Sequence, residues 1–155
     1  MEEQLIQEVI DLAFQNVMEG KGGPFAAMVV RGGHIIAIAT NTVTSTNDPT
    51  AHAEVNAIRQ ACKQLNTFQL DDCELYTSCE PCPMCFGAIY WARLRKVYYA
   101  ARQEDAAQAG FDDSFIFEQL TLPSSERKIP FVCMHHHEAI KHFVLWNRME
   151  EKIKY

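Results

Sequence analysis

Apolar residues in the first part of the chain recur at the spacing of an amphipathic helix. Within residues 2–19 they fall on one face, at Leu5, Ile6, Val9, Ile10, Leu12, Ala13 and Val17. Two apolar runs, residues 25–30 and 34–40, follow and are joined by Arg31-Gly32-Gly33, where the paired glycines favour a tight turn. The pattern predicts a helix with one face on a core, followed by a β-hairpin.

Helical and strand patterns alternate after a turn at residues 47–50. Helical patterns cover residues 52–65 and 82–93, and β-prone apolar runs cover residues 73–77 and 97–101. Because this alternation is typical of strands joined by crossover helices, the sequence predicts an α/β fold that contains parallel strands.

The pattern weakens after residue 101. Residues 104–109 predict one or two helical turns that Gly110 stops, and a polar loop covers residues 120–130. A last strand is predicted at residues 129–134 and a last helix at residues 138–153. No internal repeat separates the chain, so residues 1–155 are expected to form a single domain with the polar loop as a candidate hinge.

Composition narrows the classes of partner. The 155 residues carry a formal charge of −6 and a pI near 5.5, which disfavours nucleic acid, because phosphate binding relies on clustered Lys and Arg. We therefore expect a small-molecule substrate. No apolar run reaches membrane-spanning length, and the first residues do not form a secretory signal. We expect a cytoplasmic protein with reduced cysteines, in which Cys62, Cys73 and Cys133 are small buried apolar residues.

Two short motifs carry the candidate chemistry. His52-Ala53-Glu54 reads H-x-E, and Pro81-Cys82-Pro83-Met84-Cys85 reads P-C-x-x-C. Together they form the signature of zinc-dependent base deaminases. One imidazole and two thiolates provide three ligands for Zn²⁺ and leave the fourth tetrahedral position open for water, as a catalytic site requires. We predict one zinc ion per subunit, bound by His52, Cys82 and Cys85, with Glu54 as the catalytic acid and base.

The spacing of these residues predicts where they lie. Cys82 and Cys85 fall on one face of a helical turn, and Pro83 is tolerated there only at a helix start. His52 and Glu54, two residues apart, can converge only near a helix end, and Asp48-Pro49-Thr50 is a plausible N-cap and first turn for that helix. We expect two helix starts to face one metal ion.

A structural metal site is the alternative to a catalytic one. Cys79 precedes Cys82 by three residues, so a closed Cys₃His site in a zinc-binding module would use Cys79 as the fourth ligand. Glu54 would have no role in such a site. An iron–sulfur cluster is disfavoured, because Ile89 stands where the ferredoxin pattern needs a fourth cysteine.

The motifs sit in a chain that resembles the cytidine-deaminase-like zinc deaminases, and within them the bacterial guanine deaminases. The similar stretches extend along nearly the whole chain, at residues 22–25, 41, 47–54, 77–85, 87–92 and 109–113. The resemblance implies a three-layer α/β/α sandwich with a mixed central sheet. It also implies a homodimer whose C-terminal segment, roughly residues 120–155, is exchanged between subunits.

The same resemblance implies the reaction. A water activated at the metal would attack C2 of guanine, and Glu54 would move its proton first to a ring nitrogen and then to the departing ammonia, which gives xanthine. Guanosine, cytidine, an aminotriazine and tRNA adenosine remain alternative substrates, although the acidic charge disfavours tRNA.

The resemblance also implies the substrate contacts, at Asn41, Asp113, Phe25, Trp91, Ala53 and Tyr155. All but Ala53 have a simpler interpretation from the residues alone: a turn for Asn41, a solvated loop pair for Asp113 with its neighbour, core packing for the aromatic rings, and a frayed end for Tyr155. The tract His135-His136-His137 is an exposed turn or a short metal-binding tract.

Overall fold

The computed structural model describes residues 1–134 and 137–155, and the chain divides into two compact units, residues 1–113 and 114–155. His135 and His136, part of the tract considered above, lie outside the described residues. None of the described helices is long and apolar enough to cross a membrane.

The first unit is built on a mixed sheet. Within the described residues it has four strands in the order β2-β1-β3-β4, with β1 at Ala26–Arg31, β2 at His34–Thr40, β3 at Cys73–Cys79 and β4 at Lys96–Ala101. β1 is antiparallel to both neighbours, whereas β3 and β4 are parallel. The predicted hairpin, the parallel pair and the mixed sheet are therefore confirmed.

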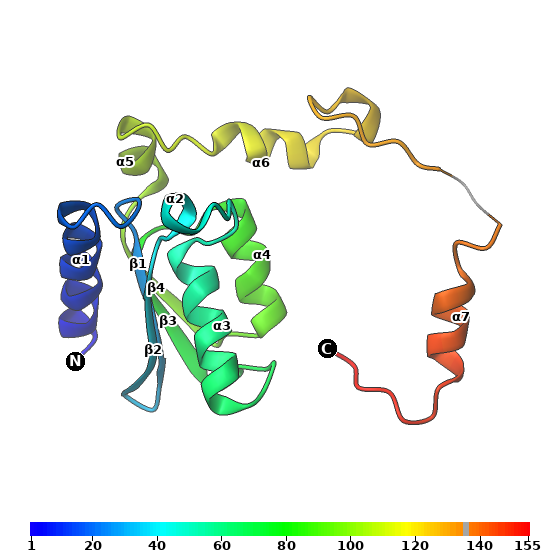
Figure 1. Ribbon diagram of the computed structural model, residues 1–155, viewed down its shortest axis with the longest axis horizontal. Helices are drawn as coiled ribbons and strands as arrows, with labels where there is room; N and C mark the ends of the chain where they lie inside the picture. The colour runs from blue at the N-terminus through cyan, green and yellow to red at the C-terminus, as the bar shows by residue number, and fades with distance from the viewer. Residues whose placement is uncertain (135–136) are drawn as a thin grey trace. The chain divides into compact units, whose positions relative to one another are not determined.

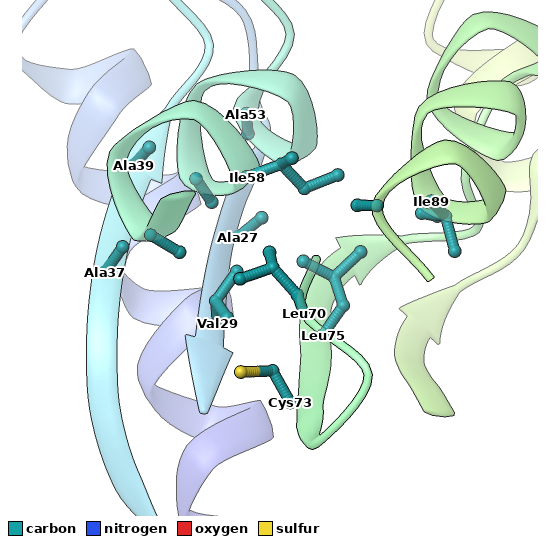
Figure 2. Close-up of a cluster of buried hydrophobic side chains, with 13 residues drawn as sticks. Ala27, Val29, Ala37, Ala39, Ala53, Ile58, Leu70, Cys73, Leu75 and Ile89 are labelled. Atoms are coloured by element: carbon teal, nitrogen blue, oxygen red, sulfur yellow. The ribbon is translucent and has the colours of Figure 1, made fainter. Parts of the chain in front are cut away.

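Helices cover both faces of this sheet, as Figure 1 shows, so the predicted three-layer sandwich is confirmed. α1 (Glu2–Met18) packs on one face through an apolar cluster that includes Val9, Met28 and Tyr76. α3 (Ala53–Leu65) and α4 (Pro83–Ala92) pack on the other face. Figure 2 shows the second cluster, in which Ile58 and Ile89 from these helices meet Val29 and Leu75 from the strands.

The start of α3 differs from the prediction. The helix begins at Ala53 with His52 as its N-cap, and not at residues 48–50. Asp48 instead closes a local turn, because its carboxylate accepts hydrogen bonds from the amide and hydroxyl of Thr50, at 2.8 and 2.7 Å. The short helix α2 (Val43–Thr46), which the sequence did not predict, precedes this turn. α5 (Gln103–Gln108) agrees with the helical turns predicted near residue 104.

The second unit differs most from the predictions. It contains α6 (Ser114–Thr121), which was not predicted, a 3-10 turn at Ser124–Glu126, and α7 (Lys141–Arg148), which is shorter than the predicted helix. The strand predicted at residues 129–134 is wrong: residues 131–134 are irregular and exposed, because a β-prone run forms a strand only beside a partner strand. Cys133 is exposed, so its prediction as a buried residue is also wrong.

Candidate metal centre and adjoining cavity

The two metal-binding motifs lie at the starts of two helices. His52 is the N-cap of α3 (φ −68°, ψ 153°) and Cys82 is the N-cap of α4 (φ −67°, ψ 169°), so both use the extended backbone that precedes a helix. Pro83 occupies the first turn of α4, and the Cys82 sulfur accepts a hydrogen bond from the Cys85 amide at 3.5 Å. The free amides at a helix start favour a thiolate at this position.

Three donor atoms converge at these helix starts. His52 Nδ1 lies 3.5 Å from the Cys82 sulfur and 3.5 Å from the Cys85 sulfur, and all three donor atoms lie within 4.8 Å of one another. With the usual zinc–nitrogen and zinc–sulfur lengths, a tetrahedral ion places such a nitrogen and sulfur about 3.6 Å apart. The three residues therefore fit a zinc ion, as the sequence predicted.

The thiols of this centre are polarised. A hydrogen bond from the Cys85 thiol lowers the pKa of the Cys82 thiol to about 4. The same hydrogen bond, together with burial, raises the pKa of the Cys85 thiol. Cys82 thus carries the negative charge of the pair, and a divalent cation among the three donors favours the thiolate form of both sulfurs.

Cys79 does not join the metal ligands. Its sulfur donates to the carbonyl of Arg102 at 3.6 Å, and burial raises the pKa of its thiol to about 11, so it stays protonated at neutral pH. In the part of the chain that the structure describes, the group of converging donors consists of His52, Cys82 and Cys85 without Cys79. Three ligands favour a catalytic site over the closed Cys₃His alternative.

Glu54 lies beside the metal ligands in the first turn of α3. Its side chain is 6% exposed, and burial raises the pKa of its carboxyl, with the Cys82 thiolate adding to the effect. A carboxyl group whose pKa is raised toward neutrality can both accept and release a proton. The sequence placed Glu54 two residues from His52, and the helix start lets both side chains reach one cavity.

A cavity of about 510 Å³ opens next to this centre, within the size range of small-molecule sites. Every residue that lines it belongs to the first unit: Gly22, Gly23, Phe25, Asn41, Val43, Thr44, His52, Glu54, Cys79, Glu80, Cys82, Gln103, Ala106, Phe111 and Asp113. The fold thus brings Asn41, Phe25 and Asp113, which the sequence proposed as substrate contacts, to the same cavity as Glu54.

Asn41 follows β2 and is buried in the cavity wall. Its side-chain oxygen accepts hydrogen bonds from the backbone amides of Gly23 at 3.4 Å and Val43 at 3.2 Å. Two backbone donors on one atom identify that atom as the oxygen of the amide. The amide NH₂ group has no hydrogen-bond partner among the described residues, so it remains available to a molecule in the cavity.

Aromatic and acidic side chains form another part of the wall. The rings of Phe25 and Phe111 meet edge to face with their centroids 5.0 Å apart. Asp113 follows Phe111 by two residues and lines the same cavity, and burial raises the pKa of its carboxyl. Phe111 was not among the predicted contacts, although the residue lies inside the stretch 109–113 that carried the resemblance.

Three of the proposed substrate contacts do not line this cavity. Trp91 is 67% exposed on α4, and Ala53 is fully buried as the first residue of α3. Tyr155 is 71% exposed and belongs to the second unit. Their roles stay predictions. The sequence also missed Gly22, Glu80 and Gln103 as lining residues, since only tertiary packing brings the segment after α1, the end of β3 and the start of α5 to one cavity.

Comparisons with known proteins agree with this geometry. A model of the cytidine and deoxycytidylate deaminase zinc-binding region matches residues 1–101. The guanine deaminase of Bacillus subtilis is 54% identical over 153 residues, which is 99% of this chain and 98% of that protein. Its X-ray structure superposes with a TM-score of 0.97 over 99% of this chain and 98% of that chain.

Two further similarities differ in how far they extend along the chain. A protein crystallised with 8-azaguanine is 39% identical, with a TM-score of 0.70 over 73% of this chain and 65% of that chain. The tRNA-specific adenosine deaminase of Aquifex aeolicus is 49% identical, but only over 78 residues, 50% of this chain and 52% of that protein. The similarity to the guanine-related proteins thus extends further along the chain.

Proposed function

We propose that this chain, which belongs to the cytidine and deoxycytidylate deaminase zinc-binding family, hydrolyses guanine to xanthine and ammonia. One observation carries the proposal: Glu54 is buried in a cavity beside the three converging metal donors, two of which, His52 and Cys82, line that cavity. The chain that holds them is similar to a guanine deaminase over nearly its whole length. The family supports the chemistry, and the extent of the similarity supports the substrate.

The reaction replaces the amino group on C2 of guanine by oxygen. A zinc ion held by His52, Cys82 and Cys85 would supply a water molecule that loses its proton near neutral pH. Glu54 takes that proton as the water oxygen bonds to C2 and delivers it to a ring nitrogen. It then carries the remaining proton of the new C2 hydroxyl to the amino group, which leaves as ammonia when the C2–N bond breaks and the C2 carbonyl forms. The products balance as xanthine and ammonia.

The cavity wall supports recognition of a purine. The NH₂ group of Asn41 is a donor that suits O6 and N7, the two acceptors on one edge of guanine. Phe25 and Phe111 offer apolar surfaces to the flat ring, and Asp113 offers a second carboxyl to the ring nitrogens. Ala53, Trp91 and Tyr155 are further proposed contacts.

Deamination of tRNA adenosine is the second candidate, because one tRNA-specific enzyme is 49% identical over half of the chain. The formal charge of −6 works against it, since binding to a polyanion requires clustered positive charge. Cytidine, guanosine and aminotriazines share the same zinc chemistry and differ from guanine only in the contacts they need.

A single assay separates these functions. Ammonia release is measured with the zinc-loaded protein on guanine, guanosine, adenine, cytosine, cytidine, an aminotriazine and a tRNA anticodon stem-loop. We expect guanine to give the highest kcat/KM. Faster turnover of guanosine would require a pocket that admits ribose, and guanosine would then replace guanine as the proposed substrate. If every compound fails while zinc stays bound, the chain is a zinc-binding module without this activity.

We also propose that the protein works as a homodimer in the cytoplasm, with roughly residues 120–155 exchanged between subunits. The apolar residues exposed on the second unit support the exchange, because they need an apolar surface to cover them. A reducing compartment suits metal ligands that are thiolates.

A further inference from the structure

We infer that Asn16, a buried side chain of α1 outside the cavity, is a positioning residue for guanine recognition. This inference rests on the proposed function. The side chain of Asn16 is 2% exposed, and its NH₂ group donates to the backbone carbonyls of Gly23 at 2.8 Å and Asn41 at 3.0 Å. One side chain thus ties the end of α1 to two segments of the cavity wall.

The contacts form a closed set around Asn41. The backbone amide of Gly23 donates to the side-chain oxygen of Asn41, while the side chain of Asn16 holds the carbonyls of both residues. The carbonyl of Asn16 also accepts a hydrogen bond from the Lys21 amide at 3.0 Å, which fixes the loop that leads to Gly23. Backbone and side chain of Asn41 are therefore held together, with its NH₂ group left for the cavity.

Gly22 completes this arrangement by its lack of a side chain. A Cβ atom at Gly22 would overlap the carbonyl oxygen of Asn41 and come within 3.2 Å of the Asn16 amide nitrogen. The loop therefore approaches Asn41 too closely for any side chain. An alanine at this position must push Asn41 away from the contact with Asn16, although Asn16 itself remains.

Burying the polar side chain of Asn16 costs stability, which supports a role beyond packing. Its side-chain oxygen is buried without a hydrogen-bond partner among the described residues, which is unfavourable for stability. The other buried side chains on this face of α1 are apolar, namely Leu5, Val9 and Ala13. We therefore attribute the presence of an asparagine at this position to the hydrogen bonds by which its NH₂ group holds Gly23 and Asn41.

The consequence concerns selectivity at C6 of the purine. A fixed NH₂ donor of Asn41 can bond to the O6 acceptor of guanine, whereas 2,6-diaminopurine carries an amino donor at the same position. Precise placement of Asn41 therefore favours guanine. If Asn16 is lost, Asn41 can turn or shift, and the preference for guanine falls.

The test uses Asn16→Leu, which keeps the branching at Cγ and removes the donors. We expect KM for guanine to rise about tenfold, the scale of one hydrogen bond, with kcat within about threefold and zinc content unchanged. The ratio of the inhibition constant of 2,6-diaminopurine to KM for guanine should fall by a similar factor. Val9→Ala, on the same buried face of α1, should lower the melting temperature without changing that ratio.

A double-mutant cycle shows whether Asn16 acts through Asn41. In the Asn41→Ala background, Asn16→Leu should produce no further loss of selectivity, because the donor it positions is gone. An equal loss in both backgrounds, or an unchanged ratio in Asn16→Leu at a lowered melting temperature, would show that Asn16 only stabilises the fold. If Asn16→Leu does not fold, Gly22→Ala replaces it and must show the same loss of selectivity.

The same measurements keep the two proposals apart. Failure of the wild-type protein to release ammonia from guanine overturns the proposed function. Normal wild-type turnover with additive effects in the cycle overturns only the role of Asn16.

Discussion

The two units of this chain contain the same kinds of apolar residue but use them differently. In the first unit, leucine and isoleucine side chains such as Leu70, Leu75 and Ile89 are buried between a sheet and the helices on it. In α6 and α7 of the second unit no side chain is buried, and Phe143 and Leu145 are 61% and 65% exposed. Apolar composition alone therefore does not make a core.

The two units also differ in the function that we expect of them: the first holds the catalytic groups, and the second is expected to take part in association. The metal donors, Glu54 and the cavity all lie in the first unit, on the starts of helices that the sheet supports. The second unit has no core of its own among the described residues and instead presents apolar side chains. We therefore expect changes in the first unit to affect metal and proton transfer, and changes in the second to affect association and the closing of the site.

Loss of a metal ligand should have the largest effect. The wild-type chain is expected to bind about one zinc ion, and Cys82→Ser or Cys85→Ser should lose both zinc and activity, because a catalytic site has only three protein ligands. Cys79→Ser is the matched control and should retain the metal, because the Cys79 thiol donates a hydrogen bond to the carbonyl of Arg102 and is not a metal ligand. Metal analysis of the purified variants measures both. Zinc loss in the control would favour the closed structural site.

The next effect concerns proton transfer within the first unit. Glu54→Gln keeps the shape of the side chain but cannot carry a proton, so the turnover number should fall by at least about 10²-fold, with zinc and melting temperature unchanged. Steady-state kinetics on the zinc-loaded variant give the answer. Near wild-type turnover would remove Glu54 from the mechanism.

A mixed dimer tests whether the second unit acts across the subunit boundary. One chain carries Glu54→Gln with an intact C-terminus, and the other carries Glu54 but lacks Tyr155, so each homodimer should be inactive or weak. If the C-terminal segment closes the partner's site, roughly one working site per dimer returns.

Titration of one chain with the other, followed by ammonia release, measures this recovery. Well-formed mixed dimers that stay as weak as either homodimer would show that the segment acts within its own chain, or that Tyr155 is a frayed end.

Two leucine-to-alanine substitutions, one in each unit, compare directly how much the two units depend on buried apolar side chains. The substitution in the second unit should have the smallest effect of all the changes proposed. Leu75→Ala empties a fully buried position and should lower the free energy of unfolding by about 2–5 kcal/mol. Leu145→Ala, at a position that is 65% exposed, should change the stability of the dilute monomer by less than about 0.5 kcal/mol.

Urea unfolding at low protein concentration measures both variants. Sedimentation at higher concentration then shows whether Leu145→Ala weakens association, as the proposed exchange requires. A large loss of stability in the dilute Leu145 variant would mean that the second unit has a core of its own after all.

The predictions made from the sequence also agree with the structure better in the first unit than in the second. In the first unit the helix at Glu2–Met18 and the hairpin at residues 26–40 were predicted, because their periodicity is repeated over many residues and packing reinforces it. In the second unit the strand predicted at residues 129–134 was wrong, because no neighbouring strand among the described residues stabilises that run. A pattern is realised only where the fold supplies its partner.

The sequence alone determined the chemistry of this protein. His52 and Glu54, and likewise Cys82 and Cys85, stand at local spacings that predict helix starts and zinc ligation. The tertiary structure decided what surrounds that chemistry. Asn41 and Phe111 reach the site from segments far apart in the chain, and Asn16 holds Asn41 from outside the cavity, through hydrogen bonds and ring contacts that no local spacing encodes. The physical reason is the separation along the chain of the residues involved. Backbone geometry alone sets the relative positions of two ligands within one helical turn, whereas a cavity wall forms only after distant segments have packed together.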